Sequence, residues 1–219
     1  MKQFLTLLLT GISVGLFAQN EVKVSEETQP FSVGSKNSIV VTIPYGKTDI
    51  AEKALKSELK DWNGKYNSSK GEYTTMQASF KAMGPKAFDA YARIISTGDV
   101  VKVAVAVDLG GAYLTSREHK AQYDAMVDRL KAFAIKTGKE CVAEELKAEQ
   151  KVLSTLEKEQ KDLEKEKESM LKSIEDYKKK ISETENKIGE NTSNQSKKKE
   201  EITKQTEKIS AVDKKKNIK

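Results

Sequence analysis

Two rows of apolar residues at seven-residue spacing run through the C-terminal part of this chain, from Val142 to Val212. Roughly half of the residues in that stretch are charged, which is typical of a coiled coil or a long helix. The first row contains Leu146, Leu153, Ile174, Ile181, Ile188, Ile202 and Ile209, and the second contains Val142, Leu156, Leu163, Met170, Tyr177 and Val212. The two rows together form a seam, which a helix buries against a partner helix. We therefore predict a helical coiled-coil stalk over residues 139–213.

The proximal part of the seam is weaker than the distal part. Gln160 and Lys167 stand in the first row and Glu149 stands in the second, at positions where a coiled coil prefers apolar side chains. If the stalk has a partner, we expect that partner along residues 142–167 or on the head domain expected at residues 37–138.

Residues 189–196 collect Gly, Asn, Thr and Ser, which are poor helix formers and are typical of a loop. We expect a turn there, so that the stalk ends in a helical hairpin with Ile202 near Ile181 and Ile188. The alternative is one unbroken helix, which needs a second chain to bury its seam. The spacing from Ile188 to Ile202 is two heptads, so the alternative keeps the register.

Residues 37–138 predict a small α+β head domain, because strand-like and helix-like patterns follow each other within it. The expected sheet is mostly antiparallel, with the helices on one of its faces. The expected strands cover residues 38–43, 72–80, 87–96 and 100–109, and the expected helices begin near Thr48 and Arg117. Residues 67–71 read as a turn.

The strand at 100–109 has two different faces. One face carries Val101, Val103, Val105 and Val107, and the other carries Lys102, Ala104 and Ala106. Because small residues allow a close approach, we expect a helix to cover the second face.

The ends of the chain have their own patterns. Residues 1–19 read as a signal peptide, with Lys2 ahead of the apolar run 4–17, and this predicts an exported protein in the periplasm or outside the cell. That run is too short to span a bilayer, and we expect no transmembrane segment in the mature chain. Residues 20–36 read as a linker or a loose first strand, and residues 214–219 as a basic tail.

One loop is a candidate ligand-binding site. Asp108, Gly110, Gly111 and Tyr113 lie just before a helix start, where backbone N–H groups can face a ligand, and Trp62 could complete a pocket for a small molecule, glycan or peptide. The alternative is a glycine turn that reverses the chain, with Tyr113 packed on the sheet.

The sequence lacks the residues that most catalytic chemistries require. The single histidine, His119, has no second His or Cys to complete a zinc site, and no nucleophile elbow or phosphate loop is present. We therefore expect no catalytic residue, metal or cofactor. The net charge of +6 is spread over lysines that alternate with glutamates, which argues against specific nucleic-acid binding. The single cysteine, Cys141, is expected to be buried.

The strand Ile39–Ile43, Trp62 at a helix end, the segment Val105–Leu114 and the Leu/Ile heptad tail together resemble a group of uncharacterised exported bacterial proteins. Members of that group have a small α+β head and a C-terminal coiled-coil hairpin. The resemblance implies architecture and compartment, and it transfers no functional residues.

Together these patterns predict a non-enzymatic structural or interaction protein. Its head would dock on a protein partner, and its stalk would act as a spacer or as an element of self-association. The alternative is a ligand-binding module that uses the loop from Asp108 to Tyr113.

Overall fold

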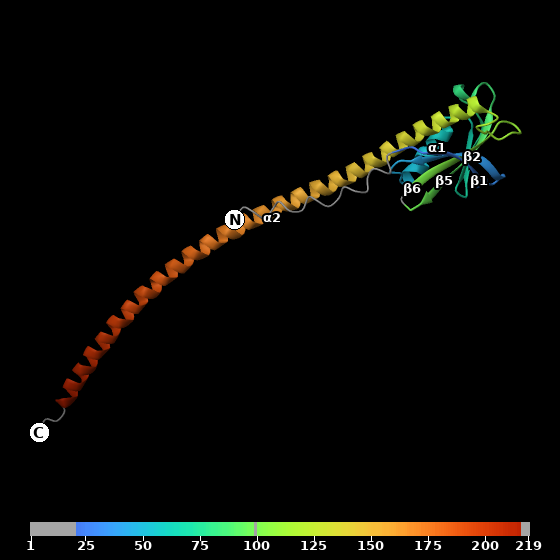
Figure 1. Cartoon of the computed structure of the whole chain (residues 1–219). Coiled ribbons are helices and arrows are strands. Elements are labelled where there is room, and N and C mark those ends of the chain that lie inside the picture. The colour runs from blue at the N-terminus through green and yellow to red at the C-terminus, as the bar shows by residue number, and fades with distance from the viewer. Residues whose placement is uncertain (1–20, 99, 216–219) are drawn as a thin grey trace. The chain divides into compact units, whose positions relative to one another are not determined.

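The computed structural model describes residues 21–98 and 100–215. The expected signal peptide and residues 216–219 of the expected tail lie outside this range, as does Asp99. The described strands are β1 (Val24–Phe31), β2 (Gly34–Ile43), β3 (Lys65–Ser69), β4 (Glu72–Ala78), β5 (Phe88–Thr97) and β6 (Val100–Asp108). The helices are α1 (Thr48–Lys60), a short 3-10 turn (Lys81–Met83) and α2 (Lys120–Lys214). Figure 1 labels most of these elements.

All strands form one antiparallel sheet in the order β1-β2-β6-β5-β4-β3. The predicted α+β class, with an antiparallel head and a long helical stalk, is confirmed. The chain divides near Gln150 into a head unit and a stalk unit that starts at Lys151. Each unit is described by itself below.

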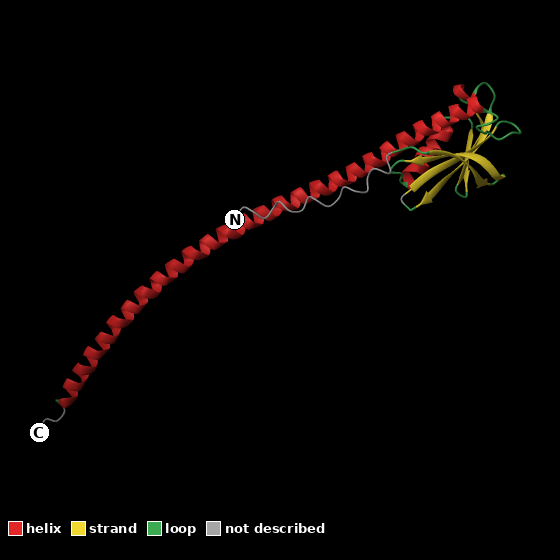
Figure 2. Cartoon of the chain, in the orientation of Figure 1, coloured by secondary structure: helices red, strands yellow, loops and turns green. Residues whose placement is uncertain are grey.

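The main core of the head lies between the sheet and its helices. Four of the five valines of β6, at every second position from Val101 to Val107, pack there with Leu55 and Leu59 of α1 and with Met126 and Leu130 of α2. The prediction that a helix covers the alanine face of β6 is wrong, because both helices lie on the valine face (Figure 2). The bulkier valines fill the space between sheet and helices.

The opposite, helix-free face of the sheet has a smaller cluster of its own. Phe31, Val40, Ala104 and Ala106 are buried in it, with Tyr91 packed alongside. The turn after β1 reaches across this face, where Arg93 Nη1 donates to Pro30 O at 2.6 Å and Ser32 N donates to Glu72 Oε2 at 2.7 Å. The alanines are therefore covered by the curled sheet itself.

The strand β3 occupies residues that read as a turn in the sequence. It pairs with β4 from Lys65 to Ser69, and the chain turns only at Lys70 and Gly71, which have φ angles of 51° and 76°. The expected turn over 67–71 is thus wrong for residues 67–69. Lys65–Ser69 is a largely exposed edge strand, so it needs little apolar patterning.

Two other strands, β1 and β4, also differ from what their sequences predict. The segment 20–36, expected as a linker or a loose strand, contains β1, which pairs along its whole length with β2. In β4, the register shifts between Thr75 and Ala78, and Gln77 has a φ of 54°. This bulge buries Thr75 and Ala78, whereas simple alternation would place Met76 and Ala78 on one face.

The helical hairpin expected in the stalk is not formed, because α2 continues through residues 189–196 without a break. The polar side chains bond along the helix instead of ending it. Thr192 Oγ1 donates to Ile188 O at 2.8 Å, Ser196 Oγ donates to Thr192 O at 3.2 Å, and Gln195 Nε2 donates to Asn191 Oδ1 at 2.7 Å. Gly189 costs only about 1 kcal/mol relative to alanine in such a helix.

The predicted burial of Cys141 is confirmed. Its Sγ accepts a hydrogen bond from Lys47 N at 3.3 Å, just before α1. Nearby, Gly138 of α2 lies so close to Pro44 that an added Cβ would sit 2.7 Å from the Pro44 carbonyl oxygen. These small residues let α2 approach the turn between β2 and α1.

Candidate functional site

The loop from Asp108 to Tyr113 is stabilised by its own side chains and backbone. Asp108 Oδ1 accepts hydrogen bonds from Gly110 N and Gly111 N, both at 2.9 Å. Leu109 N donates to Ala112 O at 2.9 Å, and Asp108 pairs with Tyr113 in an isolated β-bridge. The Asp108 carboxylate therefore already holds the loop donors that a ligand would need.

Tyr113 packs against the cluster on the helix-free face, and the Lys36 ammonium lies 4.4 Å from its ring centre. Partial burial raises the pKa of the Tyr113 hydroxyl, and the Asp108 carboxylate adds to this effect. The packing of Tyr113 on the sheet matches the glycine-turn alternative.

Trp62 belongs to the other side of the sheet. It is fully buried in the helix-side core, with its ring centre 5.8 Å from that of Phe80 and 5.9 Å from that of Phe88. Its Nε1 donates to Glu58 Oε1 at 2.9 Å, and the same carboxylate pairs with Arg129 of α2. Trp62 and Tyr113 pack in different clusters and do not share a pocket, so Trp62 supports the core.

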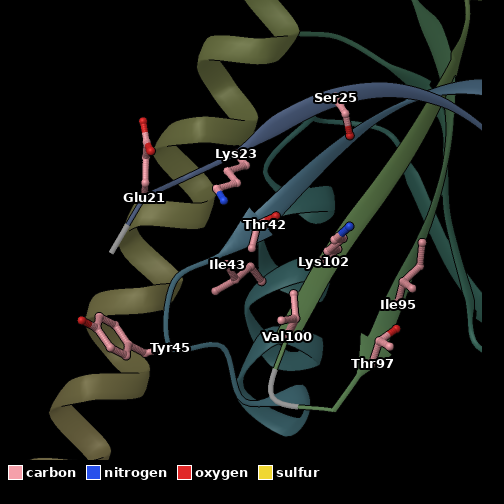
Figure 3. Close-up of a pocket in the computed structure, with 10 residues that line it drawn as sticks. All are labelled: Glu21, Lys23, Ser25, Thr42, Ile43, Tyr45, Ile95, Thr97, Val100 and Lys102. Carbon is pink, nitrogen blue, oxygen red and sulfur yellow. The ribbon is translucent and has the colours of Figure 1, made fainter. Parts of the chain in front are cut away.

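A hollow of about 570 Å³ lies on the helix-free face, near the end of the sheet where β5 turns into β6. Figure 3 shows its lining, in which polar side chains come from neighbouring strands. Its wall contains the hydroxyl residues Ser25, Thr42 and Thr97, the apolar residues Ile43, Ile95 and Val100, the charged residues Glu21, Lys23 and Lys102, and Tyr45.

Two ammonium groups give this hollow its chemical character. Lys102 lies opposite Thr42 in the β2–β6 pairing, and Lys23 lies on the chain just before β1, where its carbonyl accepts from Thr42 N at 2.9 Å. Within residues 21–98 and 100–215, neither lysine forms an ion pair. Lysines beside hydroxyls and an apolar floor suit an anionic group attached to an apolar body.

The sequence patterns missed this hollow, because its residues come from β1, β2, β5 and β6 and from the segments beside β1 and β2, which strand pairing brings together. The one signal in the sequence is Lys102, a charge beside Ala104 and Ala106 on the same face of β6. A second hollow, of about 710 Å³, lies at the other end of the helix-free face, where Ser32, Glu72 and Arg93 line it. Their hydrogen bonds there already hold the turn after β1.

The seam of the stalk unit is a long row of apolar side chains that the described residues leave uncovered. Every seam residue from Leu153 to Val212 is between 48% and 63% exposed, with Ile174 and Tyr177 at the two limits. In heptad notation the first row holds the a positions and the second row the d positions. Isolated apolar surface residues are ordinary, whereas apolar residues repeated along one helix face are typical of an interaction site.

In the part of the chain that the structure describes, no helix is long and apolar enough to cross a membrane, and no three His, Cys, Asp or Glu side chains gather to hold a metal. Comparison with known proteins gives no matching family model, no similar curated protein and no similar solved structure. The function must therefore be argued from the seam and the hollow.

Proposed function

We propose that this chain is an exported, non-enzymatic interaction protein whose stalk associates with another chain while its head docks on a partner. The observation that carries the proposal is the unbroken helix α2 with its exposed seam. An isolated helix gains most of its stability from packing an apolar face, so a seam over this length favours a second helix. Export is supported by the apolar run behind Lys2 in the sequence.

Within the stalk unit, none of the described residues folds back against the seam. The hairpin would have placed Ile202 beside Ile181, but the two residues lie on one continuous helix. From Lys151 to Lys214 that helix measures about 95 Å at the usual rise of 1.5 Å per residue. A seam of this length offers many heptads of apolar contact to a second chain.

The substitution Ile181→Asp tests the role of the seam. A carboxylate in the seam should strongly disfavour association, so the thermal unfolding of the helix should lose its dependence on protein concentration. Ser182→Asp is the matched control, because Ser182 is the next residue and lies on the solvent side of the same turn. Circular dichroism at several concentrations gives the readout. Equal melting curves for Ile181→Asp and the unchanged chain would reject the proposal.

A second candidate function is the binding of a small amphipathic anion in the hollow of the head. The observation that favours it is the pair of lysines, Lys23 and Lys102, beside Ile43 and Ile95. This site replaces the glycine loop as the place where a ligand-binding activity would reside.

The fluorescent anion anilinonaphthalene sulfonate serves as the probe for this second function. Lys102→Gln should weaken its binding to the head by several-fold, because an ammonium partner of the sulfonate is removed. Lys53→Gln, an exposed position on α1, should leave binding unchanged. If both variants bind the probe like the unchanged chain, the hollow is not an anion site.

A further inference from the structure

We propose that the stalk pairs with the stalk of a second copy of this chain in an antiparallel orientation, centred at Lys172. This inference rests on the proposed self-association and adds its direction and register. Three observations on the stalk unit carry it: the pairing of the apolar positions, the positions of polar residues in the seam, and the charges beside the seam.

The apolar positions of the distal and proximal halves match each other around this centre. In an antiparallel pair an a residue of one helix faces a d residue of the other. With the centre at Lys172, Ile174 faces Met170 of the second copy, Ile181 faces Leu163, and Ile188 faces Leu156. Each isoleucine thus meets an apolar side chain, and all of these residues are exposed in the single chain.

The two polar residues in the proximal part of the first row also find suitable neighbours in this register. Gln160 faces Thr184, and Lys167 faces Tyr177, whose ring can cover the lysine stem. The Tyr177 ring already has an ammonium near it, since Lys180 Nζ lies 5.9 Å from its centre. Gln160 and Lys167 therefore lie opposite polar or amphipathic residues, whereas Asn191 faces Leu153.

The charges beside the seam differ between the two halves. The flanking e and g positions hold Glu157, Glu159, Glu164 and Glu166 in the proximal half, and Lys178, Lys180 and Lys187 with Glu185 in the distal half. In an antiparallel pair, g faces g and e faces e. Charge complementarity between facing helices sets their orientation.

Antiparallel pairing around Lys172 joins most of these charges in opposite-sign pairs. Glu166 meets Lys180, Glu159 meets Lys187, and Glu164 meets Lys178 of the second copy. One like-charge pair remains, between Glu157 and Glu185. Symmetry repeats each pair, so the opposite-sign pairs outnumber the like-charge pairs by three to one.

A parallel pair in register is less favourable for the same residues. It places Lys167 against its own copy inside the seam and sets Glu159 beside Glu164 of the second chain. It gains the pairing of Lys180 with Glu185, which is one opposite-sign contact in this region. The isoleucines at a and leucines at d are compatible with a parallel dimer, but the charges favour the antiparallel arrangement.

Distances between spin labels on the two copies test the orientation and the centre together. Labels are attached singly to cysteine at Ser154, Lys172 or Glu190, all exposed and outside the seam, in the full chain that also carries Cys141→Ala. The expected distance at Lys172 is short, below about 30 Å, given a helix spacing near 10 Å. At Ser154 and Glu190 the expected distances are equal, at about 55 Å, because each lies 18 residues from the centre.

Each other outcome overturns a different statement. Short distances at all three positions would show parallel pairing, and unequal distances at Ser154 and Glu190 would show another register. The first result overturns the antiparallel orientation and the second overturns the centre at Lys172, so either one overturns the proposed arrangement while the proposed self-association stands. Light scattering on the same labelled samples gives their mass, and a monomeric mass for both the labelled and the unlabelled chain would overturn the self-association as well.

Discussion

Two glycines of α2 have opposite roles, although both lie within the same helix. Gly138 is buried against the Pro44 carbonyl, whereas an added Cβ at Gly189 would meet no atom within 4 Å. Helix propensity favours alanine at both positions by about 1 kcal/mol. At Gly138 this gain in helix propensity is opposed by the steric overlap of an added methyl group with the Pro44 carbonyl.

We expect Gly138→Ala to lower the free energy of unfolding of the head by about 1–2 kcal/mol, because overpacking against backbone costs more than the propensity gain. Gly189→Ala should leave the head unchanged and raise the melting temperature of the stalk helix. Urea unfolding followed by Trp62 fluorescence measures the first effect, and ellipticity measures the second. A head that is stabilised by Gly138→Ala would contradict the close contact with Pro44.

Glu26 connects β1 to the segment ahead of α2. Its Oε1 accepts hydrogen bonds from Asn37 Nδ2 at 2.6 Å and from Ser116 N at 3.2 Å. Partial burial raises the pKa of Glu26, but these hydrogen bonds and the nearby Arg117 charge outweigh burial, so the pKa lies below its ordinary value of 4.5. The charged form of Glu26 therefore favours the folded state.

Because the pKa of Glu26 is lowered on folding, its stabilising effect is present above pH 4.5 and is lost as the pH falls through the folded value. We expect Glu26→Gln to unfold at a lower urea concentration than the unchanged chain at pH 7, with the two curves converging in acid. Glu21→Gln, an exposed carboxylate near the start of β1, should show a much smaller difference. A constant difference for Glu26→Gln down to the acid limit would contradict the lowered pKa.

At the scale of single elements, the β3–β4 hairpin has an unusual turn residue. Lys70 and Gly71 both have positive φ angles, the geometry of a type I′ turn, for which Asn-Gly is the preferred pair. We expect Lys70→Asn to stabilise the head by about 0.5–1 kcal/mol, because asparagine tolerates the left-handed region better than lysine. Lys86→Asn is the control, in a turn whose lysine has no positive φ. Thermal unfolding would show no gain if the turn had another geometry.

Elements with strong apolar alternation could be predicted from the sequence. The alternating valines of β6 from Val101 to Val107 and the alternating positions of β5 from Phe88 to Ala92 are buried as their spacing indicates. The spacing of Leu55 and Leu59 likewise marked the buried face of α1. These elements have a face in the main core, and a buried face leaves a regular spacing of apolar residues in the sequence.

The elements that were missed have little or no buried face. Edge strand β3 exposes nearly all of its side chains, so its sequence resembles a turn. Residues 189–196 lie in an exposed helix, where Thr192 and Ser196 bond to backbone carbonyls one turn earlier, which composition does not reveal. The hollow beside Lys102 could not be predicted without knowledge of the strand order. Trp62 was assigned to a ligand pocket because a buried tryptophan and a ligand-binding tryptophan look alike in a sequence.

At the scale of the whole molecule, we propose that the chain self-associates through its stalk. The seam residues from Leu153 to Val212 are about half exposed in one chain, and α2 has no turn that would bury them against each other. A stable seam of this length should keep two chains together at micromolar concentration.

Sedimentation equilibrium of the chain without residues 1–19, across a range of micromolar concentrations, tests that claim most directly, because it gives mass independently of shape. We predict a mass of twice one chain that falls toward one chain only on dilution or with Ile181→Asp. A single-chain mass at every concentration, with the helix content of α2 retained, would contradict the account.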